Sequence, residues 1–339
     1  MTKNKHRYHN KFYISDLKVL VYVIGYQCYG ESTVLLIMNG DEVYYSIVID
    51  SYHYKPYNGS PLINKAVDIL RKHHVEHLDI LCWTHPHDDH SRGITTILKK
   101  FCHEQTYLLF PSYIENNAAD IVEMKNVSKD AVNKILEFNK SRKVKACPIN
   151  VIEERYNSVD EFKIVNTFDE EDEKDVRIDV ITPISNMLTS YVNSDKCDDP
   201  NELSITLIVD INDFGFYFGG DTTNDHIDAS NKDFIEKCRF IKIPHHASPT
   251  ADHLPDYLKK ERVDAVCTSV FTWGKSHNPN PKVVKSYQTF FDDIYTTNKN
   301  LKKEGHGVIL YEYDFSSGYP TREIHIEGNV GKMEKVKLH

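Results

Sequence analysis

Short apolar runs separated by turn residues recur along the chain, a pattern typical of β-strands. Residues 17–24 and 32–37 are almost entirely apolar and flank a glycine-bearing turn, so we expect two strands there. Asn39-Gly40-Asp41 is a hairpin signal, and residues 44–50 form a third run that ends at Asp50. We expect further strands at 78–83, 176–181, 204–209, 216–218 and 240–244.

Helical spacing appears beside these strands. Ile63 to His74 and Ile94 to Phe101 place apolar residues on one helical face, and they flank the strand at 78–83, so strand and helix alternate as in layered α/β folds. A further helix is predicted over 131–138, with Ser128 as its N-cap. Strand pairs recur in both halves of the chain. We therefore expect two sheets packed face to face with helices outside.

Composition narrows the class of protein. With 40% hydrophobic and 27% charged residues, the 339-residue chain is typical of a globular protein, and we expect one domain over 1–339. No apolar run reaches the ~20 residues that span a bilayer. Seven cysteines without a C-x-x-C pair predict neither a disulfide framework nor a thiolate zinc site. We expect a cytoplasmic protein with no membrane contact.

Charge is distributed unevenly. The net charge of −9 argues against a broad nucleic-acid-binding surface. Residues 239–339 nevertheless carry a net charge of +3, whereas residues 1–238 carry −12. A basic groove in the C-terminal part is therefore compatible with the sequence.

Three loops, each following an apolar strand, carry residues that ligate metals. The first has the spacing H-x-H-x-D-H over 85–90; Asp221 follows the strand at 216–218, and His245-His246 follow the strand at 240–244. Imidazoles and carboxylates in this pattern are the ligands that a two-metal hydrolytic centre requires. An exposed polar turn would explain the first loop alone, but three strand-terminal loops are hard to obtain by chance.

These motifs resemble the metallo-β-lactamase fold superfamily of hydrolases. The H-x-H-x-D-H loop, "GGD" at 219–221 and "IPHHAS" at 243–248 are similar to motifs in the hydrolase domain of bacterial competence DNA-uptake channels. The likeness runs from about Leu17 to Leu310, except for about 103–176, which we expect to be a subfamily insertion that shapes or covers the site. The resemblance implies a four-layer αββα sandwich of two mixed sheets.

The resemblance also implies a set of ligands: His85 and His87 for a first metal, Asp89 and His90 for a second, and Asp221 for both. We expect His245 to complete the second site because it comes first off its strand, with His246 as the fallback. An aspartate at the place of Asp50 holds a metal-binding histidine in orientation, although a plain strand-end turn would also explain it.

The chain departs from the family before the strand at 204–209. Most members supply a third histidine to the first metal there, but residues 195–201 contain none. Asn201 is the first candidate for that position, with Asp198 and Asp199 behind it. An oxygen-richer first site would hold zinc less tightly and tolerate manganese better.

Other residues near the motifs are further candidates for a role at the site. Arg92 stands where the family has a small residue, and it would either clamp a phosphate or pair with an acid. Ser248 would donate to substrate or cap the next helix, and His277 lies where competence-type hydrolases have a "gHP" element. The family's "GqGD" turn is similar to Tyr29-Gly30-Glu31-Ser32. We expect Lys242 to point out of the sheet.

The combined expectation is a metal-dependent hydrolase that uses two divalent ions, Zn²⁺ or Mn²⁺, and a metal-bound hydroxide. Asp89, Asp50 and Arg92 are the predicted catalytic residues. A phosphodiesterase or nuclease with a nucleic-acid or other phosphodiester substrate is the leading hypothesis. A hydrolase of small esters, lactones or thioesters is the second, and a non-catalytic binding scaffold is the third. Protein partners stay open.

Overall fold

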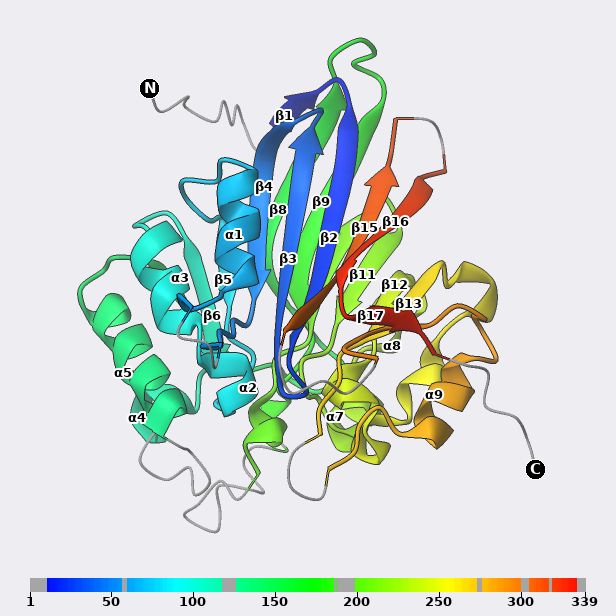
Figure 1. The fold of residues 1–339 in the computed structure, drawn as a ribbon. Coiled ribbons are helices and arrows are strands. Elements are labelled where there is room, and N and C mark those ends of the chain that lie inside the picture. The colour runs from blue at the N-terminus through cyan, green and yellow to red at the C-terminus, as the bar shows by residue number, and fades with distance from the viewer. Residues whose placement is uncertain are drawn as a thin grey trace.

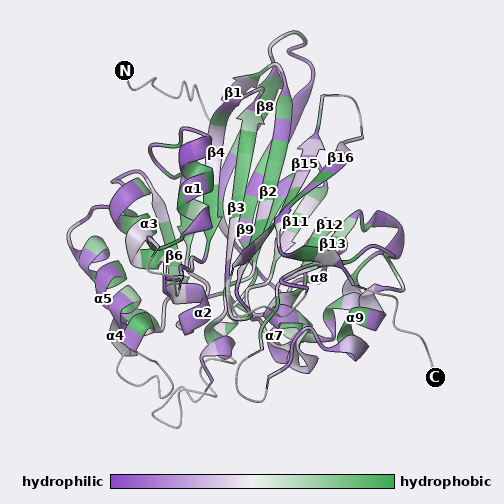
Figure 2. Ribbon diagram, viewed as in Figure 1, coloured by the Kyte–Doolittle hydropathy of each residue, from purple (hydrophilic) through white to green (hydrophobic). Residues whose placement is uncertain are grey.

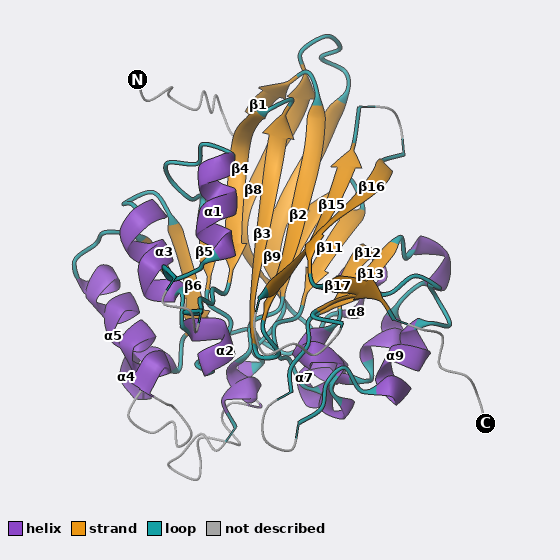
Figure 3. Cartoon of the chain, viewed as in Figure 1, coloured by secondary structure: helices purple, strands orange, loops and turns teal. Residues whose placement is uncertain are grey.

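A computed structural model describes residues 11–56, 60–117, 126–185, 187, 199–272, 276–299, 305–316 and 319–333. Their strands form two mixed sheets that lie face to face, as Figure 1 shows. Helices cover the outer face of each sheet (Figure 3). The predicted pair of sheets with helices outside is confirmed at this level. Among the described residues, none of the helices has the length and apolar character that crossing a bilayer requires.

The first sheet has eight strands in the order β16-β15-β2-β3-β4-β5-β6-β7. Its strands are β2 (Leu17–Tyr26), β3 (Gly30–Asn39), β4 (Glu42–Ile49), β5 (Ile80–Cys82), β6 (Tyr107–Pro111), β7 (Lys145–Ile149), β15 (His306–Asp314) and β16 (Thr321–Gly328). Strands β2, β3 and β4 pair antiparallel, whereas β4 to β7 pair parallel. Gly30 opens β3 against the Tyr52 ring, where a Cβ atom would lie 2.1 Å from ring carbon Cγ.

The second sheet has nine strands in the order β1-β8-β9-β10-β11-β12-β13-β14-β17. Its strands are β1 (Lys11–Ile14), β8 (Asn157–Asn166), β9 (Glu173–Val180), β10 (Leu207–Ile211), β11 (Phe214–Phe218), β12 (Cys238–Lys242), β13 (Ala265–Thr268), β14 (Tyr295–Thr297) and β17 (Val330–Lys332). Strands β9, β10 and β11 pair antiparallel and β11 to β14 pair parallel. The parallel strands therefore end at a common edge.

Helices and 3-10 turns connect the strands. The α-helices are α1 (Lys65–Lys72), α2 (Asp88–Ser91), α3 (Ile94–Phe101), α4 (Ile114–Asn117), α5 (Asn126–Lys140), α7 (Asn224–Ala229), α8 (Lys232–Glu236) and α9 (Pro281–Tyr287). The 3-10 turns are η2 (Pro200–Leu203), η3 (Pro244–Ala247), η4 (Pro249–Ala251), η5 (Leu254–Tyr257) and η6 (Lys260–Arg262). Helix α1 begins after Asn64, whose side chain accepts a hydrogen bond from the Val67 amide, a normal N-cap.

The hydrophobic core has three parts that follow the layers. One cluster joins the facing sides of the two sheets, with Val21 on β2 and Phe216 on β11 among its members. A second packs the outer side of the eight-stranded sheet against α1, α3 and α5. A third packs the nine-stranded sheet against α7, α8 and α9. The central strands are mainly hydrophobic, whereas the helices also carry hydrophilic residues (Figure 2).

The segment 103–176 is integrated into the fold. Strands β6 and β7 extend the eight-stranded sheet, and β8 and β9 lie in the nine-stranded sheet. The segment therefore contributes strands to both sheets, and its being an insertion relative to the family stays a prediction. Within it, Ser128 is not an N-cap: it lies inside α5 and its hydroxyl donates to Asp88 Oδ1 at 3.0 Å. This bond ties α5 to the H-x-H-x-D-H loop.

Candidate metal centre

The three predicted loops meet between the two sheets. The H-x-H-x-D-H loop follows β5, Asp221 follows β11, and His245 and His246 lie in η3 after β12. Backbone hydrogen bonds hold these loops in place. The Ile205 amide, before β10, donates to the Thr84 carbonyl at 3.1 Å, and the His245 amide links the second and third loops by donating to the Gly220 carbonyl at 2.9 Å. Ligand types from distant parts of the chain thus converge on one place.

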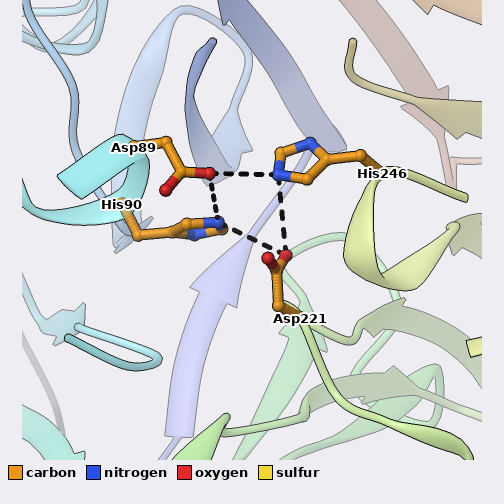
Figure 4. Close-up of side chains that lie close together, drawn as sticks. All are labelled: Asp89, His90, Asp221 and His246. Atoms are coloured by element: carbon orange, nitrogen blue, oxygen red, sulfur yellow. Dashed lines mark hydrogen bonds and ion pairs between the residues drawn. The ribbon is translucent and has the colours of Figure 1, made fainter. Parts of the chain in front are cut away.

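The first of two groups around Asp221 contains Asp89, His90 and His246 (Figure 4). His90 Nε2 lies 3.3 Å from Asp89 Oδ2 and 3.3 Å from Asp221 Oδ1. His246 Nε2 lies 3.2 Å from Asp89 Oδ2 and 3.7 Å from Asp221 Oδ1. All four side chains are buried. This group corresponds to the predicted second metal site.

The other group contains His85, His87 and Asp221. His85 Nε2 lies 3.8 Å from Asp221 Oδ2, and the His85 and His87 rings are 4.9 Å apart. The two carboxylate oxygens of Asp221 therefore face different groups of histidines. A carboxylate that bridges two metal ions is placed in this way.

Unpartnered buried atoms support the assignment of a cation site. His85 Nε2, His90 Nε2 and Asp221 Oδ1 are buried and have no hydrogen-bond partner. Nearly all buried polar atoms in folded proteins have a partner, and leaving one without costs about 1–3 kcal/mol. Nitrogen and oxygen lone pairs that converge on one point are what a Zn²⁺ or Mn²⁺ ion needs. The donor set therefore fits the predicted divalent ions.

Three of these histidines are held from behind at their other ring nitrogen. His90 Nδ1 lies 2.7 Å from Asp50 Oδ2, and Asp50 also accepts hydrogen bonds from the Thr84 amide and hydroxyl. His85 Nδ1 contacts Thr84 Oγ1 at 2.9 Å, and His246 Nδ1 contacts Ser269 Oγ at 2.9 Å. Such partners fix the tautomer and direct Nε2 inward. Asp50 thus lies behind a histidine, as the sequence predicted, and the structure shows that this histidine is His90.

The structure corrects the assignment of the two adjacent histidines. His246, rather than His245, joins Asp89 and His90. The reason is the backbone of η3, where His245, His246 and Ala247 have φ angles of 49°, 52° and 61°. This left-handed turn sends His246 into the buried group, and His245 Nε2 lies 3.8 Å from Asp221 Oδ2, the oxygen that faces His85.

The prediction for Lys242 is also wrong. The residue is only 2% exposed, and its Nζ donates to Glu31 Oε1 at 2.6 Å. Ser269 donates to the other oxygen of Glu31, which also lies 3.3 Å from His246 Nδ1. Glu31 is thus a buried acid behind the second group, which sequence reasoning noted only as part of a turn. Its one sequence signal is a carboxylate at the start of the apolar strand β3.

Burial and mutual contacts shift the pKa values of the centre. Burial lowers the pKa of His85 well below its usual value. For His90 and His246 burial acts in the same direction, but neighbouring carboxylates, Asp221 foremost, outweigh it and raise the pKa. Burial favours the neutral forms of Asp89 and Asp221, yet the facing histidines lower both pKa values below the normal range. The two carboxylates are therefore charged and attract cations.

Arg92 lies beside the aromatic ring of Tyr52. Its guanidinium carbon is 4.9 Å from the centroid of the Tyr52 ring. Arg92 makes no ion pair with any residue that the structure describes, so the alternative of an acidic structural partner finds no support there. Its side chain is half-buried.

The remaining candidates are placed as follows. Asn201 is buried in η2, and its side-chain Oδ1 has no hydrogen-bond partner. The backbone amide of Asn201 donates to Asp199 Oδ1 at 3.0 Å. Asp198 lies outside the described residues. Ser248 caps η4 by accepting a bond from the Thr250 amide, as one of its two readings predicted. His277 is exposed and belongs to neither group around Asp221.

A scan against models of known protein families finds no match, and a search of curated protein sequences finds none either. The family resemblance therefore stays a prediction that rests on the motifs.

Proposed function

We propose that this chain is a metal-dependent hydrolase with the metallo-β-lactamase fold and that it cleaves phosphodiester bonds. The observation that carries the proposal is Asp221, whose two oxygens face separate groups of histidines, all of them buried except the half-buried His87. The layered α/β architecture and the strand-terminal loops agree with that fold. Two divalent ions, Zn²⁺ or Mn²⁺, are the proposed cofactors.

The chain's own residues would hold these ions. His85 and His87 would bind one, Asp89, His90 and His246 the other, and Asp221 both. When bound, two such ions supply Lewis acidity and bring the pKa of water near neutrality. Asp50 fixes the His90 ring through Nδ1, so the imidazole presents Nε2 without reorganisation. The protein thus contributes a preorganised, buried cradle.

Arg92 and its neighbours support a phosphodiester substrate. A row of aromatic rings begins at His246, a proposed ligand. The centroid of the Phe271 ring lies 5.1 Å from that of His246, Tyr29 lies 5.3 Å from Phe271, and Tyr52 lies 5.7 Å from Tyr29. Arg92 lies over the Tyr52 ring. A guanidinium recognises phosphate oxygens, and aromatic rings stack on nucleobases. Tyr52 under Arg92 is buried, whereas Tyr29 and Phe271 are half-buried. A cation near half-buried rings therefore favours a nucleotide or nucleic acid over a small ester.

The test is hydrolysis of bis(p-nitrophenyl) phosphate and of end-labelled single- and double-stranded DNA, with Mn²⁺ or Zn²⁺ added. Wild type is compared with Asp89→Ala and with Asp130→Ala, an exposed residue of α5 that serves as control. We expect cleavage by wild type and the control, and loss in Asp89→Ala. Turnover of p-nitrophenyl acetate or a lactone, without phosphodiester cleavage, would instead support the small-ester hydrolase.

A further inference from the structure

We propose that His245 is the third protein ligand of the first metal, taking the place of the histidine that is missing before β10. The inference rests on the proposed dinuclear centre and assigns to the His245-His246 pair one ligand for each ion. It replaces the expectation that an oxygen donor, Asn201, completes the first site.

The side chains of His245 and His246 both point toward Asp221. Adjacent residues of an extended strand point to opposite faces, but His245 and His246 both direct Nε2 to Asp221. His245 Nε2 lies 3.8 Å from Oδ2, and His246 Nε2 lies 3.7 Å from Oδ1. Because His85 Nε2 is also 3.8 Å from Oδ2, His245 approaches the same carboxylate oxygen as His85, from just outside the group of His85, His87 and Asp221.

A left-handed backbone turn produces this arrangement. Three consecutive residues without a glycine, His245, His246 and Ala247, have left-handed φ angles. Each costs roughly 1 kcal/mol or more, and strain of this kind persists where the surrounding structure imposes it, often at functional sites. A fold that needed only His246 in the centre would not require the turn to direct His245 to the same carboxylate.

The His245 ring is held at its other nitrogen, Nδ1. Three of the proposed ligand histidines share one arrangement, in which Nδ1 contacts a side-chain oxygen and Nε2 faces Asp221 or Asp89: His85, His90 and His246. His245 follows it, because its Nδ1 lies 2.8 Å from Thr250 Oγ1, which in turn lies 3.1 Å from Ser248 Oγ. This is the outer support that metal-binding histidines receive.

The chemical consequence concerns metal preference. Three imidazoles and a shared carboxylate form a nitrogen-rich site, which suits zinc, whereas an amide oxygen in place of one imidazole would favour harder ions such as Mn²⁺. We therefore expect the first ion to be held as firmly as the second, rather than being the labile one.

The experiment measures metal content and affinity, independently of catalysis. Metal-free wild type, His245→Ala, Asn201→Ala and Thr250→Val are loaded with Zn²⁺, dialysed and analysed by inductively coupled plasma mass spectrometry, and the affinities come from competition with a chromophoric chelator. His253→Ala is the matched control, since His253 is an exposed histidine of the neighbouring turn, paired with Asp228. Far-UV circular dichroism checks the fold of each variant.

We expect two equivalents of Zn²⁺ in wild type, in His253→Ala and in Asn201→Ala. His245→Ala should retain one, with its second equivalent weakened more than about 100-fold, and Thr250→Val should weaken one equivalent about 10–100-fold. Thr250→Val also decides the matter if His245→Ala fails to fold. The inference would be overturned if His245→Ala bound two equivalents of Zn²⁺ at wild-type affinity. If His245→Ala does not fold, the same result in a folded Thr250→Val would overturn it. Either result would leave the dinuclear centre intact. Wild type that binds fewer than two ions would instead overturn the centre itself.

Discussion

The buried pair of Lys242 and Glu31 allows a quantitative prediction of stability. Their side chains are 3% and 4% exposed, and Nζ lies 2.6 Å from Oε1. Removing one partner of such a pair leaves a buried charge without compensation, which costs about 3–5 kcal/mol, whereas replacing both partners by neutral residues is often close to neutral. We therefore expect Lys242→Met to lose about 3–5 kcal/mol of unfolding free energy.

The double variant Glu31→Gln/Lys242→Met should recover much of this loss. The substituted glutamine would keep an oxygen for the Ser269 hydroxyl but carry no charge. The expected coupling energy between the two positions is about 2–3 kcal/mol. Urea unfolding of wild type, both single variants and the double variant, all metal-free, completes the thermodynamic cycle.

The loss in Lys242→Met should also depend on pH. In wild type burial raises the pKa of Glu31, but Lys242 and the histidines outweigh it, so the net shift is downward. Without Lys242 the effect of burial gains weight and the folded-state pKa rises. A carboxyl whose folded pKa lies above its unfolded value destabilises the protein above that pKa and ceases to do so as pH falls through it. The deficit should therefore be larger at pH 8 than at pH 5.

Two results would refute this reasoning. Losses that add independently in the double variant would mean that the two charges do not depend on each other. A Lys242→Met protein within about 1 kcal/mol of wild type at pH 8 would mean that Glu31 is solvated or protonated in the folded state.

Three further predictions concern substrate, metal and a buried acid. Arg92→Gln should raise KM for bis(p-nitrophenyl) phosphate at least about tenfold, because a charge-assisted contact contributes roughly 1.5–3 kcal/mol; an unchanged KM would remove Arg92 from the substrate site. Chelation with EDTA should lower the unfolding free energy by about 5 kcal/mol relative to protein at free metal 100-fold above Kd, because each of the two ions contributes about 2.7 kcal/mol, as urea unfolding would reveal. Burial raises the pKa of Asp179 to about 6 despite Arg177 nearby, so wild-type stability should fall as pH rises from 4 to 6. Asp179→Asn should abolish this slope and stabilise the protein at pH 7.5 by about 1–2 kcal/mol after solvent screening is allowed for, with no gain at pH 4.

The layout of the site could be predicted from local patterns. An apolar run followed by ligand residues marks the end of a buried strand, and neighbouring parallel strands end at one edge of a sheet. For this reason the loops with His85 to His90, Asp221 and the histidine pair were predicted together, and Asp50 was predicted to lie behind a histidine, which the structure shows to be His90.

Residues whose roles depend on distant partners or on unusual backbone could not be placed. Lys242 was expected to alternate out of the sheet, but it is buried against Glu31, a partner that lies 211 positions away in the sequence. The left-handed turn at His245 and His246 has no glycine to signal it. Ser128 looks like an N-cap in the sequence, but its hydroxyl bonds to Asp88 in another element.

The segment 103–176 shows a related limit. Its departure from the family motifs suggested an insertion, and strands β6 to β9 place the segment in both sheets. Strands at these places are set by pairing and burial, which many sequences satisfy, so the family motifs could not predict where the segment lies.

The central claim is that Asp221 bridges two metal ions, and anomalous diffraction from crystals grown with Zn²⁺ or Mn²⁺ tests it most directly. The account predicts two anomalous peaks about 3.5–4 Å apart, one beside His85 and the other between His90 and His246, with Asp221 ligating both. A single peak, or none at saturating metal, would contradict it.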